Sequence, residues 1–150
     1  MKVRCLISYI SDDLAVKVGL PDKGARYYYG LTPEKEYIVL GISYDPRNES
    51  HSGNPFVYIK DDDGGCTTAP LFLFKIIDDT VSRYWKLQYD NSLLTLYPES
   101  FYKNIYYMED LAERVPETKA DFENLCKLFD EEYELSYPVQ QSNSPNVQTT

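Results

Sequence analysis

The chain is poor in histidine and cysteine. Its 150 residues include one histidine, His51, and three cysteines at positions 5, 66 and 126. The cysteines are far apart and show no C-x-x-C spacing, whereas a structural zinc site needs four ligands that meet in space. We therefore predict no metal site and interpret each cysteine as a small buried apolar residue in a reducing compartment.

The sequence also lacks the common motifs of catalysis and nucleotide binding. It contains no G-x-x-x-x-G-K-[ST], no G-x-G-x-x-G and no G-x-S-x-G. His51 stands in a loop rich in proline, serine and glycine, which indicates a solvated side chain rather than a catalytic base. We predict a protein that is not an enzyme, with no catalytic residue and no cofactor.

Basic residues and long apolar runs are scarce as well. The chain has 24 acidic and 15 basic side chains, a formal net charge of −9. This balance disfavours binding to nucleic acid or to anionic lipid, both of which require cationic side chains. The apolar stretch Val3–Ile10 is too short for a signal peptide or a membrane span, and Ser11, Asp12 and Asp13 follow it. We expect a cytoplasmic protein.

What the sequence does contain, up to Tyr97, is a series of short segments rich in β-branched and aromatic residues. Asp61–Gly65 and Asp90–Ser92 supply turn residues for two hairpins, and Asp45–Pro55 has the composition of a loop. The pattern predicts an antiparallel sheet, either a small SH3-like β-barrel or a curled sheet. The expected strands are Val3–Ile10, Ala25–Tyr29, Glu36–Tyr44, Phe56–Lys60, Leu71–Ile77, Tyr84–Tyr89 and Leu93–Tyr97.

Beyond Tyr97 the periodicity becomes helical. Pro98 and Pro116 each favour a helix start, and Ile105–Arg114 fits a short helix between them. The helix after Pro116 carries an apolar stripe expected to pack on the sheet, formed by Phe122, Leu125, Cys126, Phe129 and Tyr133. We predict one α+β domain over residues 1–138, β-rich in 1–97 and helical in 98–137, followed by a polar tail over 139–150.

Negative charge and tyrosine are enriched in particular places. Residues 1–97 hold 13 acidic and 11 basic side chains, whereas residues 98–150 hold 11 and 4, a net of −7. Tyrosine accounts for 15 residues, and rigid tyrosines beside carboxylates are typical of protein-binding surfaces. We predict that a basic protein partner contacts Tyr27, Tyr28, Asp61, Asp62, Asp63, Glu109, Asp110 and Glu113.

Three segments carry a resemblance to a known module. Leu31–Ile42 (LTPEKEYIVLGI), Phe56–Gly64 (FVYIKDDDG) and Phe72–Asp78 (FLFKIID) resemble an SH3-like β-barrel. The segment from Trp85 to Leu111 resembles immunity proteins of contact-dependent growth inhibition and related polymorphic toxin systems. The resemblance implies a bacterial cytoplasmic antitoxin that blocks one cognate toxin domain, often a nuclease. It assigns no functional residue, because such proteins use different surfaces against different toxins.

Two alternatives stay open beside the immunity protein. The first is a non-catalytic adaptor or peptide-binding module, for which exposed apolar surface on the sheet would be the sign. The second is a metal-dependent hydrolase built on Asp61–Asp63. An EF-hand is excluded there, because position twelve counted from Asp61 is Phe72 rather than glutamate. Three adjacent carboxylates repel one another, so the turn needs a cation nearby. The sequence does not determine the oligomeric state.

Overall fold

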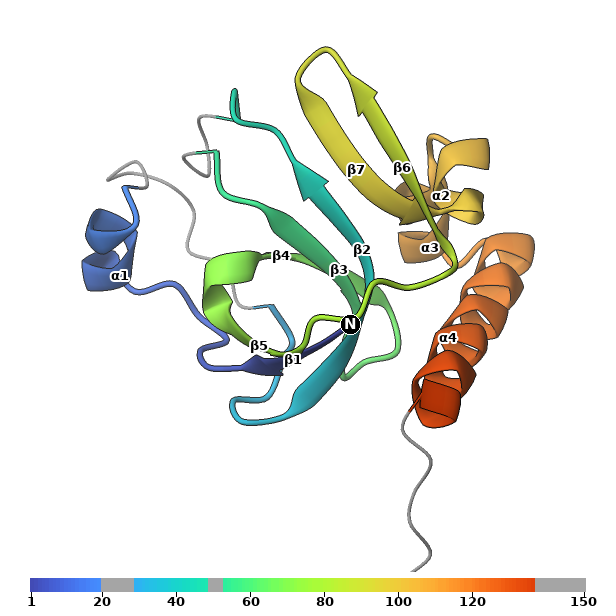
Figure 1. Ribbon diagram of the computed structural model, residues 1–150, viewed down its shortest axis with the longest axis horizontal. Coiled ribbons are helices and arrows are strands. Elements are labelled where there is room, and N and C mark those ends of the chain that lie inside the picture. Colours follow the sequence, from blue (N-terminus) through green and yellow to red (C-terminus); the bar gives the residue numbers. More distant parts are fainter. Residues whose placement is uncertain (20–28, 49–52, 137–150) are drawn as a thin grey trace, which may run out of the picture.

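A computed structural model describes residues 1–19, 29–48 and 53–136. Within them, seven antiparallel strands form a sheet that curls without closing, and the C-terminal helices cover its outer face (Figure 1). The α+β class and the curled-sheet alternative are confirmed, and no closed barrel forms. The strands are β1 (Lys2–Cys5), β2 (Glu36–Tyr44), β3 (Phe56–Lys60), β4 (Cys66–Pro70), β5 (Phe74–Asp78), β6 (Trp85–Asp90) and β7 (Leu93–Pro98). The helices are α1 (Asp12–Lys17), the 3₁₀ turn η2 (Leu71–Leu73), α2 (Glu99–Lys103), α3 (Tyr107–Ala112) and α4 (Pro116–Ser136).

Strand β2 organises the sheet. One of its edges pairs with β3, while the other pairs with β1 near Glu36 and with β7 near Tyr44. Because β1 and β7 share an edge of β2, the sheet divides there. One arm runs β4-β3-β2-β1-β5, and the other is the β6–β7 hairpin, which projects away from it (Figure 1).

The dense apolar run in β2 follows from burial on both of its faces. Tyr37 and Val39 point into the curl of the sheet, and Leu40 is buried near the helices. A bulge between Val39 and Gly41 shifts the register against β3. A Cβ atom at Gly41 would lie 3.0 Å from the Tyr97 ring, so glycine lets that ring approach the strand.

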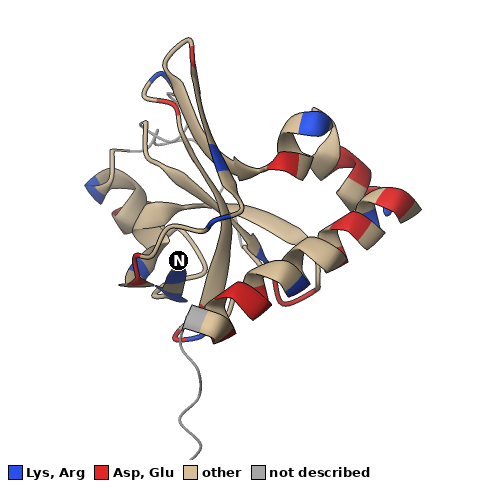
Figure 2. Ribbon diagram, turned by 45° about the vertical axis from the view of Figure 1, so that its right-hand side comes forward, with Lys and Arg blue, Asp and Glu red and all other residues tan. Residues whose placement is uncertain are grey.

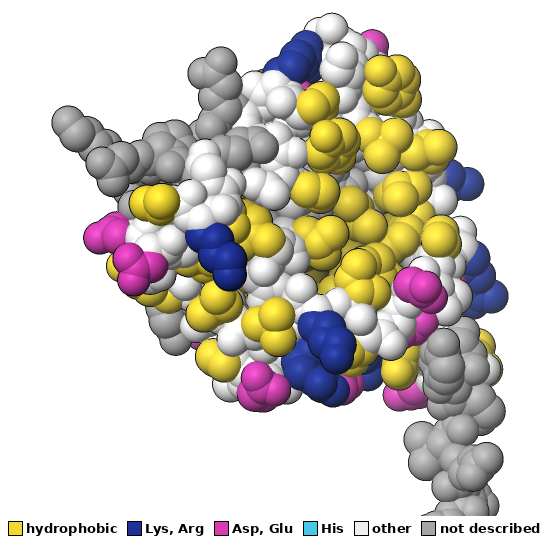
Figure 3. Space-filling model, turned by 60° about the vertical axis from the view of Figure 1, so that its left-hand side comes forward, with side chains coloured by type: hydrophobic (Ala, Val, Ile, Leu, Met, Phe, Trp, Pro, Cys, Tyr) yellow, Lys and Arg dark blue, Asp and Glu magenta, His cyan; other side chains and the backbone are white. Residues whose placement is uncertain are grey.

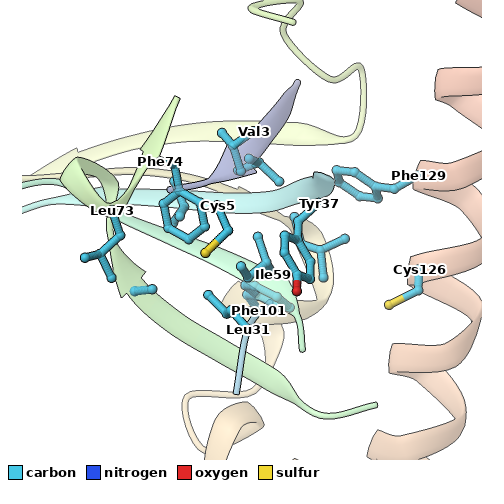
Figure 4. Close-up of a cluster of buried hydrophobic side chains, with 14 of the residues drawn as sticks. Val3, Cys5, Leu31, Tyr37, Ile59, Leu73, Phe74, Phe101, Cys126 and Phe129 are labelled. Carbon is cyan, nitrogen blue, oxygen red and sulfur yellow. The ribbon is translucent and has the colours of Figure 1, made fainter. Parts of the chain in front are cut away.

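Side chains from several strands fill the inside of the curl. Val3, Ile59 and Leu73 have no exposed surface, and they cluster with Phe74 and Tyr37 (Figure 4). Burial of such side chains is worth about 1.5–3 kcal/mol each, which makes this cluster the main source of stability for the first arm.

A second, aromatic core lies between the sheet and the helices. The rings of Tyr58, Tyr97, Phe101 and Tyr107 pack against one another in edge-to-face and tilted pairs, with centroids 4.9–5.7 Å apart. The hydroxyl groups of Tyr58 and Tyr97 are hydrogen-bonded at 2.9 Å. The Trp85 indole N–H donates to the Leu40 carbonyl at 2.9 Å. Much of the tyrosine excess is therefore structural.

Helix α4 rests on the sheet through the predicted stripe. Phe122, Leu125, Cys126 and Phe129 are buried, and Tyr133 is half-buried. The Glu132 carboxylate accepts bonds of 2.7 Å from the Ser82 hydroxyl and from the Arg83 backbone N–H. These contacts fasten α4 to the segment that leads into β6. None of the helices in residues 1–19, 29–48 and 53–136 is both long and apolar enough to cross a membrane.

Several predicted elements differ from the structure. Strand β1 ends at Cys5, and helix α1 follows it, capped by the Ser11 hydroxyl, which accepts the Leu14 N–H at 3.2 Å. The predicted strand Leu71–Ile77 begins instead as the 3₁₀ turn η2, because Pro70 starts that turn. The predicted strand Ala25–Tyr29, apart from Tyr29, lies outside the described residues, as do His51 and the predicted tail over 139–150.

Candidate functional site

The acidic turn between β3 and β4 is tightly organised by Asp61. One Asp61 carboxylate oxygen accepts the backbone N–H groups of Asp63 at 2.9 Å and Gly65 at 3.0 Å. The Asp61 N–H in turn donates to the Gly65 carbonyl at 2.9 Å. Gly64 has a φ of 85°, in the left-handed region that glycine tolerates. Asp61 thus shapes the turn that presents its two neighbours.

The cation that this turn requires comes from the chain itself. The Asp62 carboxylate accepts bonds from Lys35 Nζ at 2.5 Å, the Thr32 hydroxyl at 2.6 Å and the Tyr37 hydroxyl at 2.9 Å. These bonds lower the pKa of Asp62 to about 2, and the bond from Lys35 has the largest effect, followed by the bond from Thr32. Asp62 therefore joins the turn to the start of β2, whereas the neighbouring Asp63 is an exposed residue that these bonds do not involve.

The low pKa of Asp62 predicts a pH-dependent contribution to stability. Because the pKa is lower in the folded chain than in the unfolded chain, the contribution is full above about pH 4 and is lost as the pH falls towards 2. Asp62→Asn should lower the melting temperature at pH 7, and the difference from wild type should close over that acidic range. Thermal melts at several pH values test this, with Asp79→Asn as a control for the lost charge. A difference that stays constant with pH would contradict the assignment.

Two clefts flank the acidic turn. The first, of about 590 Å³, lies between the turn and α4, and Lys60, Cys126 and Asp130 contribute to its walls. The second, of about 430 Å³, separates Asp61 and Asp63 from the end of α3 and the start of α4. The fold thus brings the turn close to the α3–α4 corner, although about fifty residues separate them in sequence.

The predicted acidic residues of α3 differ in their surroundings. Glu109 and Glu113 are exposed at the α3–α4 corner. Asp110 is half-buried, and it accepts a bond of 2.9 Å from the Asn104 side-chain amide, which ties α3 to the end of α2. Glu109 and Glu113 are therefore available for a partner, while Asp110 fixes the helix that carries them.

The acidic surface extends from α3 along α4. Figure 2 shows acidic residues recurring along α4 and in the turn beneath it. Among the residues that the structure describes, six exposed carboxylates on these two helices form no ion pair. We call them the acidic corner: Glu109, Glu113, Glu117, Glu123, Asp130 and Glu134.

The described residues include neither of the two tyrosines that were predicted as partner contacts. Tyr27 and Tyr28 lie outside the described residues. Tyr107 is buried and donates to the Asp121 carboxylate at 2.7 Å, and burial followed by this bond raises the pKa of its hydroxyl. Tyr106, by contrast, is 61% exposed and precedes Glu109 by three residues. Its exposed ring offers an aromatic contact at the acidic corner. From the sequence alone, Tyr106 could not be distinguished from the buried Tyr107.

A second surface, which the sequence did not reveal, is apolar. On β2, β6 and β7 the inner face of the sheet continues beyond the core and is not covered by the described residues, so that Leu87 is 64% and Tyr89 70% exposed. Figure 3 shows hydrophobic side chains gathered in a continuous patch on this side of the molecule. Strand register places on this open face Ile42, Tyr44, Leu87, Tyr89, Leu94 and Leu96.

The described residues contain no group of three or more histidine, cysteine, aspartate or glutamate side chains placed to hold a metal ion. Cys5 and Cys126 are buried, Cys66 is half-buried, and all three are free thiols. Burial raises the pKa of Cys126 to about 11 and that of Cys66 further. These thiols are protonated at neutral pH.

Comparison with known proteins adds no relative: no protein-family model, no curated protein sequence and no solved structure matches the chain. The fold and the two surfaces define an α+β protein with an open antiparallel sheet, an acidic corner and an open apolar face.

Proposed function

We propose that the protein is an immunity protein that binds a basic bacterial toxin domain through opposite charge and neutralises it without catalysis or cofactor. The observation that carries this proposal is the acidic corner, with its six exposed carboxylates that lack ion pairs within the described residues. Carboxylates that recur along α3 and α4 without ion pairs give this flank of the molecule a negative potential, which attracts a cationic partner. The Asp61–Asp63 turn adds negative charge beside the same corner.

Such a surface suits a toxin that acts on nucleic acid. A nuclease needs a basic groove to hold phosphates, and an acidic protein seated in that groove excludes the substrate. The net charge of −9 attracts such a partner over a distance of about 8–10 Å at physiological salt, which speeds the encounter. Tyr106 supplies the aromatic contact that holds the complex once formed.

Co-expression with the product of the adjacent upstream gene tests this proposal. We expect the two proteins to co-purify, and we expect growth arrest when the neighbouring gene is expressed without this chain. A basic isoelectric point for the neighbour would agree with the proposed contact. Failure of the complex to form, together with normal growth of a host expressing the neighbour alone, would exclude an immunity role.

The open apolar face supports a second candidate, a non-catalytic adaptor or peptide-binding module. Exposed apolar surface on the sheet is the feature that this function requires, and Leu87, Tyr89 and Tyr44 provide it. An extended apolar peptide would lie across β2, β7 and β6.

Two double variants separate the candidates. Tyr44→Gln with Leu87→Gln removes apolar area and keeps the charge, and both positions are exposed enough for the fold to tolerate the change. If the adaptor function holds, this variant loses the partner, whereas Glu109→Lys with Glu113→Lys retains it. The opposite pattern supports the immunity function.

A further inference from the structure

Strand β6 lies at an edge of the sheet. Among the described strands it pairs only with β7, and the hairpin that they form projects from the rest of the molecule (Figure 1). Its sequence, Trp85-Lys86-Leu87-Gln88-Tyr89-Asp90, contains no proline or bulge that would block pairing on the outer side. An edge of this kind is a template for another strand.

The turn determines which backbone groups of β6 are directed outward. Asn91 and Ser92 have φ values of 49° and 69°, as in a two-residue primed hairpin turn. In that geometry the flanking pair Asp90–Leu93 is hydrogen-bonded, and alternate pairs along the ladder are bonded likewise. The N–H and C=O groups of Leu87 and Tyr89 therefore point away from β7. The same two residues expose their side chains on the open apolar face.

We propose that β6 pairs with β6 of a second copy of this chain, antiparallel about a two-fold axis at Gln88. In this register Leu87 stands opposite Tyr89 of the second copy, and both residues have outward backbone groups. Two symmetry-related pairs of this kind exchange four backbone hydrogen bonds. The two sheets become one, and their apolar faces lie on the same side of it. This inference does not depend on the proposed function, since no other protein takes part.

The charges of β6 complement one another in this register alone. Lys86 and Asp90 are four residues apart and both are exposed on the face opposite Leu87. Two-fold pairing about Gln88 sets Lys86 against Asp90 of the second copy, twice. Opposite charges directly across a ladder stabilise it, whereas a shift by two residues removes both pairs.

Strand β5 is another edge strand of the sheet that carries both a lysine and an aspartate, but it does not offer the same pairing of opposite charges. In β5, Lys75 pairs with Arg4 and Asp78 with Lys2 of β1, and a bulge between these two pairs interrupts the regular alternation of the strand. A bulge of this kind protects an edge against regular pairing with a second strand, so β5 does not set Lys75 against Asp78 of a second copy in an unbroken ladder. The self-complementary spacing is thus a property of β6.

Sedimentation equilibrium of the full chain, over about 10 µM to 1 mM, tests the proposal in the range expected for an interface below standard size. We expect a monomer–dimer equilibrium. Hydrogen exchange of the unmodified protein gives a second measurement. The amides of Leu87 and Tyr89 should become protected as the protein concentration rises, while the other outward amides of the sheet should not change.

Charge exchange supplies matched variants. Lys86→Glu alone and Asp90→Lys alone place like charges opposite each other, and each should weaken the dimer about ten-fold. The double variant restores two opposite-charge pairs and should recover the wild-type dimer. A protein that is monomeric throughout the range, a dimer that the single variants leave unchanged, or a double variant no better than the single ones would overturn the proposal.

Discussion

Reversing two charges on α3, with Glu109→Lys and Glu113→Lys together, is expected to lower the affinity for a basic partner about ten- to a hundred-fold. Both side chains are exposed and neither forms an ion pair within the described residues, so the reversal breaks no described ion pair. They are four residues apart, and two lysines repel each other as two glutamates do, so the stability of α3 should change little. The loss should come mainly from slower association.

The matched control is Asp13→Lys with Asp79→Lys. It changes the net charge from −9 to −5, as the α3 variant does, at exposed positions outside α3 and α4. Association rates with the purified partner, measured at several salt concentrations, separate the two effects. The wild-type protein and the control should bind with a steep salt dependence that the α3 variant lacks. Equal losses in both variants would assign the effect to net charge and argue against a defined acidic site.

Most strands and both hairpin turns could be predicted because their signals are local, whereas strand β4 (Cys66–Pro70) was not predicted. Asp90–Ser92 and Asp61–Gly65 contain the residues that primed or glycine-containing turns require, and both hairpins form there. The stripe on α4 was equally readable, since a helix buries residues at a spacing set by its own geometry. Helix α1 was missed because it has only six residues and comes just after the apolar run Val3–Ile10, and Ser11, which caps it, is equally typical of a strand end.

The openness of the sheet could not be predicted, because it depends on which strands share an edge. Strands β1 and β7 both pair with the same edge of β2, and about ninety residues of sequence separate them. An alternating pattern in β6 and β7 indicates one apolar face but not whether another element covers it. The open apolar face was therefore visible only in the structure.

The acidic turn shows a similar limit. The sequence indicated that Asp61–Asp63 needs a cation, but the source of that cation could not be read from it. The register of β1, β2 and β3 brings Lys35 to Asp62 across 27 residues, and Tyr37 and Thr32 arrive with it. A patch that resembled a partner site therefore divides into a structural carboxylate, Asp62, and an exposed one that these bonds do not involve, Asp63.

Replacing Phe122 with alanine is expected to cost about 3–5 kcal/mol of unfolding free energy. Phe122 is 1% exposed and lies at the centre of the face that α4 buries. The cavity left behind removes packing between α4 and the rest of the domain. For a domain of this size the cost corresponds to a fall in melting temperature of about 8–15 °C. Leu135→Ala is the control, because Leu135 is 75% exposed on the same helix and should change stability by less than about 0.5 kcal/mol.

Trp85 reports this unfolding directly. It is the one tryptophan of the chain, it is 8% exposed, and its indole is bonded to Leu40 in the centre of the sheet. A partner held by charges on α3 and α4 needs these helices docked on the sheet. Phe122→Ala should therefore bind normally below its lowered melting temperature and lose the partner above it, whereas Glu109→Lys with Glu113→Lys should bind weakly at every temperature. A Phe122→Ala protein as stable as wild type would show that α4 is not anchored through this side chain, and the acidic corner would then lack the rigid support that the proposed binding requires.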